Sequence, residues 1–380
     1  MIIPREQHLQ EIRRRLELAP VVAIIGARQV GKTTLAGMIA DGFAGDVTRF
    51  DLEDPKDLAR LSEPQLALEP LRGLIVLDEI QRLPGLFTLL RVLADRPESP
   101  ARFLVLGSAS PELLRQTAET LAGRISYYEL PGFVLREVGA AAHGRLWSRG
   151  GFPRSFLAPD DAASELWRQD FVRTHLERDL PSLGINLAPQ TMRRFWTMVA
   201  HLHGQLWNGS RLGAALGVAH TTARAYLDVL VDTYMVRLLP PWVANVGKRQ
   251  VKSPKVYVRD CGLLHALLGI LSPEDLMAHP VVGASWEGFA AEQVIRSLGV
   301  PERDCYFWAT HAGAELDLLI SRGSRLEGFE FKRTLAPSVT RSMRSALETL
   351  GLERLTVVYP GADAFPLASD VQVRPVSDFA

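Results

Sequence analysis

The chain has 380 residues, of which 47% are hydrophobic and 23% charged, and its 43 basic and 43 acidic residues give a net charge of zero. This length predicts two or three domains, and the neutral total excludes a protein that attracts nucleic acid or membranes over its whole surface, although a local basic patch is compatible with it. The two cysteines have no paired spacing and no apolar run is long enough for a signal peptide or a membrane span, so we expect a soluble cytoplasmic protein with no membrane contact.

Residues 1–135 show short apolar runs that alternate with helical patterns. The runs cover residues 21–25, 47–52, 74–77, 103–106 and 125–130. Such alternation is typical of parallel strands joined by crossover helices. We therefore predict a three-layer αβα domain, with helices on both faces of one sheet.

The first run leads into a glycine-bracketed loop that ends in Lys-Thr. Gly26 and Gly31 allow the backbone to curl with its N–H groups inward, and the helix that begins near Lys32 points the positive end of its dipole at the same place. The pattern predicts a phosphate-binding loop, in which Lys32 contacts the β- and γ-phosphates and Thr33 offers a hydroxyl to Mg²⁺. An ordinary glycine-rich turn is the alternative. The predicted nucleotide-binding residues are Gly26, Ala27, Arg28, Gln29, Val30, Gly31, Lys32, Thr33 and Thr34.

An acidic pair, Asp78 and Glu79, follows the third apolar run. A buried strand would deliver Asp78 to the carboxyl edge of the sheet, where it can hold Mg²⁺. Glu79, one residue later, is placed to orient or deprotonate the attacking water. Coming after a phosphate loop, the pair predicts nucleotide hydrolysis rather than binding alone.

Two further candidates flank the last strands of this domain. If the fourth strand lies beside the first, the Ser108 hydroxyl would sit between the acidic pair and the γ-phosphate; a helix cap is the alternative. Arg124 is predicted to enter the nucleotide site of a neighbouring subunit in a homo-oligomer, and a cation at a helix C-terminus is the alternative.

Helical patterns follow, and we predict a helical lid or linker over residues 136–205. Residues 206–262 have a different pattern: two short helices at 211–216 and 221–230 flank a turn at Gly217, and strands follow at 235–239 and 256–259. Two short helices about a tight turn predict a helix-turn-helix with a wing. A small helical packing unit without a ligand is the alternative.

Basic side chains concentrate in residues 248–259, which contain five cations and no acid. In a neutral protein such an asymmetry favours contact with a phosphate backbone, and a solvated charged face is the alternative. The predicted nucleic-acid contacts are Arg224, Lys248, Arg249, Lys252 and Lys255.

The last region, residues 263–380, reads helix, three strands, helix, strand, and predicts a separate α/β unit. Glu330 and Lys332 are two residues apart on one strand, and hairpin pairing brings Asp317 beside them. We predict that Asp317 and Glu330 hold a second Mg²⁺, that Lys332 positions or deprotonates a water, and that Glu287 or Glu292 from the preceding helix completes the site. A hairpin with a cross-strand ion pair is the alternative.

These motifs occur together in one known family. They are Gly-Ala-Arg-Gln-Val-Gly-Lys-Thr-Thr at 26–34, Leu-Asp-Glu-Ile-Gln at 77–81, Gly-Ser-Ala at 107–109, Leu-Ala-Gly-Arg at 121–124, Gly-Gly-Phe-Pro at 150–153, Glu-Arg-Asp-Leu at 177–180, Ser-Pro-Lys-Val-Tyr at 253–257 and Ser-Trp-Glu-Gly-Phe at 285–289. Over nearly its whole length the chain resembles the prokaryotic AAA-superfamily ATPases that carry a C-terminal domain of unknown function related to PD-(D/E)xK nucleases. Ala27 stands where proline is common, which should not impair phosphate binding because the backbone performs it.

The resemblance implies a P-loop ATPase domain at 1–135, a winged-helix-like region at 206–262 and a restriction-endonuclease-like fold at 263–380, with ATP and Mg²⁺ as ligands. We expect an ATP-hydrolysing protein that acts on or with DNA. One alternative is an ATP-dependent switch or scaffold that binds a protein partner and keeps an inert nuclease-like fold. Another is an Mg²⁺-dependent nuclease gated by ATP.

Overall fold

The computed structural model describes residues 3–97, 101–108, 121–243 and 251–380. The chain divides into two compact units, which are described separately. The first comprises Met1–Gly132 with Asp232–Tyr234, and the second comprises Phe133–Val231 with Met235–Ala380. Of the basic segment, Lys248 and Arg249 lie outside the described residues.

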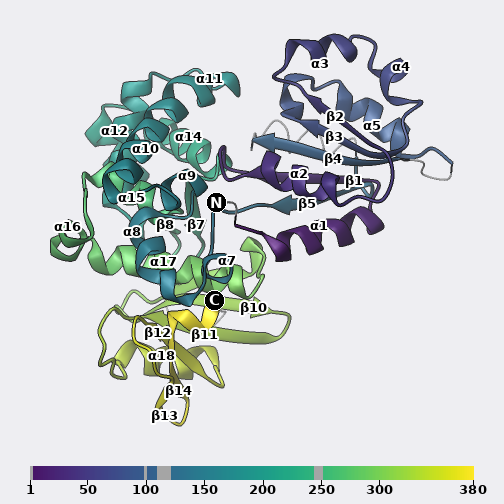
Figure 1. Ribbon diagram of the computed structural model, residues 1–380. Helices are drawn as coiled ribbons and strands as arrows, with labels where there is room; N and C mark the ends of the chain where they lie inside the picture. The colour runs from purple at the N-terminus through teal and green to yellow at the C-terminus, as the bar shows by residue number, and fades with distance from the viewer. Residues whose placement is uncertain (1–2, 98–100, 109–120, 244–250) are drawn as a thin grey trace. The chain divides into compact units, whose positions relative to one another are not determined.

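The first unit is built on a parallel five-stranded sheet, with its strands in the order β2-β3-β4-β1-β5. Figure 1 shows the five labels in this order. The strands are β1 (Val21–Gly26), β2 (Val47–Asp51), β3 (Gly73–Asp78), β4 (Ala101–Ser108) and β5 (Ile125–Glu129). The five predicted strands are confirmed. Every residue of β1 is buried, as expected for a strand covered on both faces.

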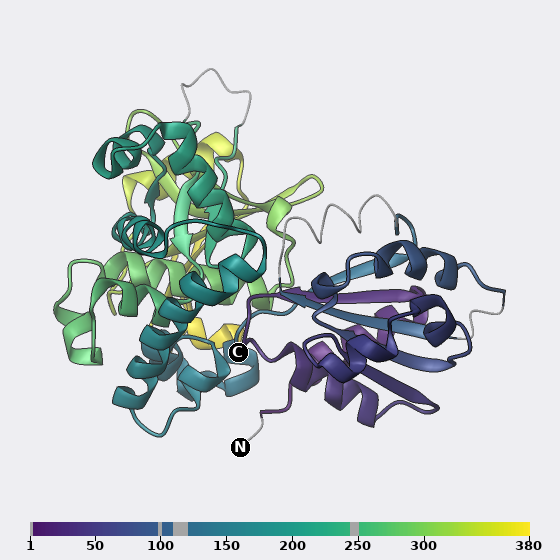
Figure 2. The same cartoon turned by 90° about the horizontal axis from the view of Figure 1, so that it is seen from above.

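Helices cover both faces of this sheet (Figure 2). Alternate residues of β1, among them Val21 and Ala23, share one core cluster with Leu90 of α5. Helices α1 and α2 contact β1 and β4, and their buried side chains lie outside that cluster, so they cover the opposite face. The predicted three-layer arrangement is therefore confirmed. The helices are α1 (Glu6–Leu18), α2 (Lys32–Asp41), α3 (Pro55–Arg60), α4 (Pro64–Leu68), η1 (Ile80–Arg82) and α5 (Leu86–Ala94).

The second unit begins with helices, as predicted. They are α7 (Leu135–Val138), η2 (Ala140–Ala142), α8 (His143–Arg149), α9 (Pro153–Phe156), α10 (Asp161–Thr174), η3 (His175–Asp179), α11 (Leu180–Ser182) and α12 (Pro189–His201). Helix α10 begins at Asp161, because the Asp160 side chain caps it by accepting from the Ala163 N–H. It passes into a π-helical turn, η3, before α11.

A pair of short helices and a small sheet follow. The elements are β6 (Gln205–Leu206), α13 (Gly209–Leu216), α14 (His220–Asp232), β7 (Val236–Leu239) and β8 (Lys255–Val258). Gly217 ends α13 with a φ of 73°, a left-handed conformation that favours glycine. Strand β8 pairs antiparallel with both β6 and β7. The two helices and two strands expected here are present, together with β6, which the sequence did not predict.

The C-terminal part holds a six-stranded sheet in the order β13-β14-β12-β11-β10-β9. Its elements are α15 (Cys261–Leu268), α16 (Pro273–Ala278), α17 (Val282–Ser297), η4 (Glu302–Asp304), β9 (Cys305–Ala309), β10 (Glu315–Arg322), β11 (Arg325–Phe331), α18 (Arg341–Leu350), β12 (Leu355–Tyr359), β13 (Phe365–Ala368), β14 (Val371–Pro375) and η5 (Val376–Phe379). Strands β9 to β11 are antiparallel, whereas β12 lies parallel to β11 and β14. The sequence did not predict β13 and β14.

None of the helices among the described residues is long and apolar enough to cross a bilayer.

Two glycines of α17 provide a test of how tightly the second unit is packed. A Cβ on Gly288 would lie 2.3 Å from Nε2 of the buried His203, whereas a Cβ on Gly283 would meet nothing within 4 Å. We expect Gly288→Ala to destabilise this unit by about 1–3 kcal/mol through overpacking. The matched Gly283→Ala should be neutral or stabilising by up to about 1 kcal/mol, because alanine favours helices.

Urea unfolding followed by tryptophan fluorescence is the measurement, since all seven tryptophans lie between residues 147 and 308 and report on the second unit alone. Equal midpoints for the two variants would contradict the close packing of His203 against α17.

Candidate nucleotide site and a second acidic cluster

The phosphate loop, residues 26–34, joins the end of β1 to the start of α2. Gly31 precedes the helix with a φ of 96°, and Gly26 has a φ of 147°. A Cβ on Gly26 would lie 2.4 Å from the Leu130 carbonyl oxygen. Gln29 also has a positive φ, 63°, which is uncommon for a residue with a side chain. The backbone therefore turns sharply toward the N-terminus of α2, as the glycine spacing predicts.

Lys32 lies across the loop that precedes it. Its Nζ donates to the carbonyl oxygens of Gly26 at 3.0 Å and Ala27 at 2.9 Å, and the side chain is buried. An ammonium at the mouth of a phosphate loop is placed to exchange these carbonyls for phosphate oxygens.

Thr33 and Asp78 connect the loop to β3. The Thr33 hydroxyl donates to Asp78 Oδ2 at 2.7 Å. Burial raises the pKa of the Asp78 carboxyl, whereas the Thr33 hydrogen bond acts in the opposite direction. A hydroxyl and a carboxylate are the hard oxygen donors that Mg²⁺ prefers, so these two residues fit the ion that the fold family implies.

Glu79 and Ser108 lie together beside this pair. Strand β4 runs between β3 and β1, and Ser108 is in register with Gly26. The Ser108 hydroxyl donates to Glu79 Oε2 at 3.2 Å, and the Gln81 side chain also hydrogen-bonds to this carboxylate. Glu79 has a φ of 53°, a left-handed conformation that costs about 1–3 kcal/mol for such a residue. The condition on which the Ser108 prediction depended, that its strand lies beside the first, is therefore met.

Two arginines bind the phosphate loop to its surroundings. Arg28 of the loop forms an ion pair with Glu53 at 2.7 Å. Arg5, which is buried, donates to the Val30 carbonyl at 3.1 Å and to the Pro131 and Gly132 carbonyls at 3.0 and 3.2 Å. Arg5 was not predicted from the sequence, because the carbonyls that it binds in and after the phosphate loop lie far along the chain and no motif marks them.

Arg124 lies at the opposite edge of the sheet from this chain's own phosphate loop. Its carbonyl accepts from the N–H of Val21, the first residue of β1, whereas the loop follows the last residue. Its guanidinium forms two hydrogen bonds with Asp95, at 2.6 and 2.8 Å. Arg124 therefore does not reach the site of its own chain, and its predicted contact with a neighbouring subunit stays a prediction.

The described candidate nucleic-acid contacts fall into two groups. Arg224 and Lys252 are exposed, and Arg224 pairs with Asp228 at 2.9 Å. Lys255 is different, because its side chain is only 3% exposed. A buried ammonium cannot contact a phosphate backbone, so the prediction of Lys255 as a nucleic-acid contact is wrong. The charge run counts cations correctly but carries no information on which of them are buried.

Lys255 instead belongs to an acidic cluster between β8, α17 and β10. Its Nζ lies 3.0 Å from Glu287 Oε1 and 3.6 Å from Asp317 Oδ1, and it also pairs with Glu315. Burial opposes its charge, but Tyr257 and these carboxylates raise the pKa of Lys255 well above its ordinary value. The predicted meeting of Glu287 with Asp317 is thus present, with a lysine between them.

Glu330 near the end of β11 and Lys332 just after it lie beside this cluster. Lys332 Nζ pairs with Glu330 Oε1 at 2.6 Å, which agrees with the prediction that both side chains point the same way. Asp317 Oδ2 accepts from the Phe331 N–H at 2.9 Å. Burial and the nearby Asp317 carboxylate raise the pKa of Glu330 to about 8 and that of Glu287 to about 7.

These contacts argue against the predicted second Mg²⁺ site. Across the described ranges, no group of three or more His, Cys, Asp or Glu side chains is arranged to hold a metal ion. Ammonium groups lie among these carboxylates instead: Lys255 contacts Glu287 and Asp317, and Lys332 pairs with Glu330. The prediction of a metal site formed by Glu287, Asp317, Glu330 and Lys332 is therefore corrected to an internal ion-pair cluster.

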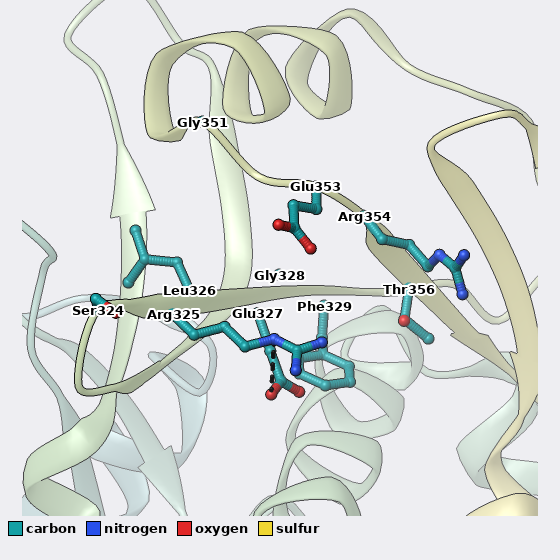
Figure 3. A pocket seen from close by; sticks show the side chains of 10 residues that line it. All are labelled: Ser324, Arg325, Leu326, Glu327, Gly328, Phe329, Gly351, Glu353, Arg354 and Thr356. Carbon is teal, nitrogen blue, oxygen red and sulfur yellow. Dashed lines mark ion pairs between the residues drawn. The ribbon is translucent and has the colours of Figure 1, made fainter.

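A hollow of about 370 Å³ lies elsewhere on the C-terminal sheet, over β11 and the start of β12 (Figure 3). Charged side chains of both signs line it, including Arg325, Glu327, Glu353 and Arg354. Figure 3 shows the ion pair between Arg325 and Glu327, which the structure places at 4.0 Å. None of the predicted site residues lines this hollow.

Comparison with protein families divides the chain into three matched segments. Residues 19–139 match the AAA domain family. Residues 142–274 match a domain of unknown function (DUF8612), and residues 282–379 match another (DUF4143). The AAA match agrees with the parallel sheet and phosphate loop of the first unit.

Among solved structures, the chain is similar to the Walker-type ATPase paby2304 of Pyrococcus abyssi, with 14% identity over 70% of this chain and 96% of that one and a TM-score of 0.48. It is also similar to the RuvB Holliday junction branch migration motor of Thermotoga maritima, with 20% identity over 63% and 90% of the two chains and a TM-score of 0.31.

Closer relatives are two uncharacterized proteins, one of Mycobacterium bovis and one of Mycobacterium tuberculosis. Each is 52% identical to this chain over 375 residues, which is 99% of this chain and 84% of the relative. The chain belongs to the family of these two mycobacterial proteins, and its residues 19–139 match the AAA domain family.

Proposed function

We propose that the protein binds ATP with Mg²⁺ and hydrolyses it. The observation that carries this proposal is the convergence of Lys32, Thr33, Asp78, Glu79 and Ser108 where β1, β3 and β4 end. A nucleotide needs a positive loop for its phosphates, oxygen donors for its metal and a base for its water, and one edge of the sheet supplies all three.

Each residue has a role in this proposal. The N–H groups of the phosphate loop surround the phosphates, and Lys32 moves from the carbonyls of Gly26 and Ala27 to the β- and γ-phosphates. Thr33 and Asp78 would hold the Mg²⁺, which neutralises phosphate charge when bound. Glu79 accepts the proton of the attacking water, and Ser108 positions Glu79 beside the γ-phosphate.

Assembly and domain division belong to the same proposal. Arg124 of a neighbouring subunit would release Asp95 and stabilise charge on the γ-phosphate, which makes hydrolysis depend on a homo-oligomer. We retain the functional division into an ATPase domain at 1–135, a helical lid at 136–205, a winged-helix-like region at 206–262 and a nuclease-like domain at 263–380.

We further propose that the ATPase acts on or with DNA through the winged-helix-like region. The support is that Arg224 on α14 and Lys252 before β8 are both exposed to solvent. Lys252 also adjoins the basic residues Lys248 and Arg249 in the chain. Such cations contribute affinity for phosphates that is independent of base sequence.

A second candidate is an ATP-dependent switch or scaffold that binds a protein partner while its nuclease-like domain is inert. The observation that favours it is the acidic cluster of the C-terminal domain, in which the ammonium of Lys255 lies between Glu287 and Asp317. An ATP-gated nuclease has no comparable support.

The role of Glu79 is tested by Glu79→Gln, which keeps the size of the side chain and removes its basicity. We expect the ATP turnover number to fall by about 10²- to 10⁴-fold, the usual contribution of a general base, while ATP affinity is retained. Phosphate release and fluorescent-nucleotide binding measure the two quantities. Glu63→Gln, a matched change at an exposed glutamate, should leave both unchanged. If Glu79→Gln turns over ATP as fast as the unaltered protein, Glu79 is not the general base.

DNA contact is tested by the double variant Arg224→Ala/Lys252→Ala. If both cations meet phosphates, affinity should fall similarly for duplexes of different sequence, and the slope of log affinity against log salt should become less steep by about 2. The control Arg173→Ala/Lys56→Ala removes two exposed charges elsewhere. If the unaltered protein binds neither duplex, single-stranded nor branched DNA at low salt, the DNA proposal fails and the protein-partner candidate replaces it.

A further inference from the structure

Lys255 is a charged residue in an unusual place. It is the first residue of β8, a strand whose four residues are all buried. The Nζ atom reaches Glu287 on α17 at 3.0 Å and Asp317 on β10 at 3.6 Å, and it pairs with Glu315 on β10. It also lies 5.7 Å from the centre of the Phe307 ring. Three carboxylates and one aromatic face thus surround a single ammonium.

The same carboxylates make hydrogen bonds that leave little room for another cation. The Tyr257 hydroxyl donates to Glu287 Oε1 at 2.6 Å, the oxygen that Lys255 also contacts. The Phe331 N–H donates to the second oxygen of Asp317 at 2.9 Å. A buried ammonium is tolerated only when it is paired in this way, so the cluster is adapted to a lysine.

We infer that the Lys255 ammonium holds the position that a divalent cation would take among Glu287, Glu315 and Asp317, so that the C-terminal domain neither needs nor uses a metal there. Because Lys255 is covalently part of the chain, its ammonium is present at the cluster in every folded molecule. A divalent ion from solution would have to displace this ammonium and give up its own hydration water. This inference concerns a different site from the nucleotide, and its failure would leave the proposed ATPase function standing.

The cation also connects parts of the second unit that are distant in the sequence. Strand β8 pairs with β6 and β7, and Lys255 joins that small sheet to α17 and β10. A freely exchanging metal would make this connection depend on ion concentration. The lysine makes it a permanent part of the fold.

The test is a Mn²⁺ titration of the full chain without nucleotide, followed by electron paramagnetic resonance. The unaltered protein should bind no Mn²⁺ at this cluster below millimolar concentrations. Lys255→Met keeps an unbranched side chain one atom shorter and removes the charge, so this variant should bind Mn²⁺ at least about tenfold more tightly than the unaltered protein. That gain should disappear in Lys255→Met/Asp317→Asn, and Lys56→Met, at an exposed lysine, should show none.

Thermal unfolding gives a second readout. Exchanging EDTA for Mn²⁺ should leave the Tm of the unaltered second unit unchanged, while Lys255→Met should unfold at a lower temperature and be raised by Mn²⁺. The inference is overturned if the unaltered protein binds one Mn²⁺ per chain that Asp317→Asn abolishes and Asp78→Asn retains. It is also overturned if a folded Lys255→Met binds Mn²⁺ no more tightly than the unaltered protein and its Tm is not raised by Mn²⁺. If Lys255→Met does not fold, the inference is tested by comparing the Mn²⁺ titrations of the unaltered protein, Asp317→Asn and Asp78→Asn.

Discussion

The hydrogen bond from Thr33 to Asp78 joins the first helix after the phosphate loop to the third strand, and the proposed site depends on it. It forms because all five strands are parallel, so the ends of β1, β3 and β4 meet at one edge. Ser108 and Glu79 are brought into contact by the same arrangement. A sheet with another strand order would separate the phosphate loop and Ser108 from Asp78 and Glu79.

Two acidic clusters in this chain contrast in how their charge is neutralised. At the nucleotide site, Asp78 accepts from a neutral hydroxyl and retains its capacity for a cation. At the C-terminal cluster, Glu287 and Asp317 already share the ammonium of Lys255. The two sets of carboxylates therefore differ in the groups that contact them: a neutral hydroxyl at Asp78, and an ammonium at Glu287 and Asp317. This difference locates the proposed metal-dependent chemistry in the ATPase domain.

Local patterns were sufficient to predict which elements meet at the candidate nucleotide site. Strand periodicity, glycine spacing and the acidic residues after an apolar run predicted the sheet, the phosphate loop and the contact of Ser108 with the Asp78–Glu79 edge. Lys255 was misassigned because its burial depends on carboxylates that come 32 or more positions later, which a charge run does not reveal. Arg5 was missed for a similar reason, since the backbone carbonyls that accept its hydrogen bonds lie 25 or more positions later in the chain. The short strands β13 and β14 each contain a proline, which weakens a strand pattern.

The central claim is that MgATP is bound by the loop between β1 and α2 together with the ends of β3 and β4. Hydrogen–deuterium exchange with and without a non-hydrolysable ATP analogue and Mg²⁺ tests it most directly, because exchange reports on individual backbone segments. The account predicts slowed exchange in peptides that cover residues 26–34 and 78–79. Binding of the analogue without protection of residues 26–34, or protection confined to the C-terminal domain, would contradict it.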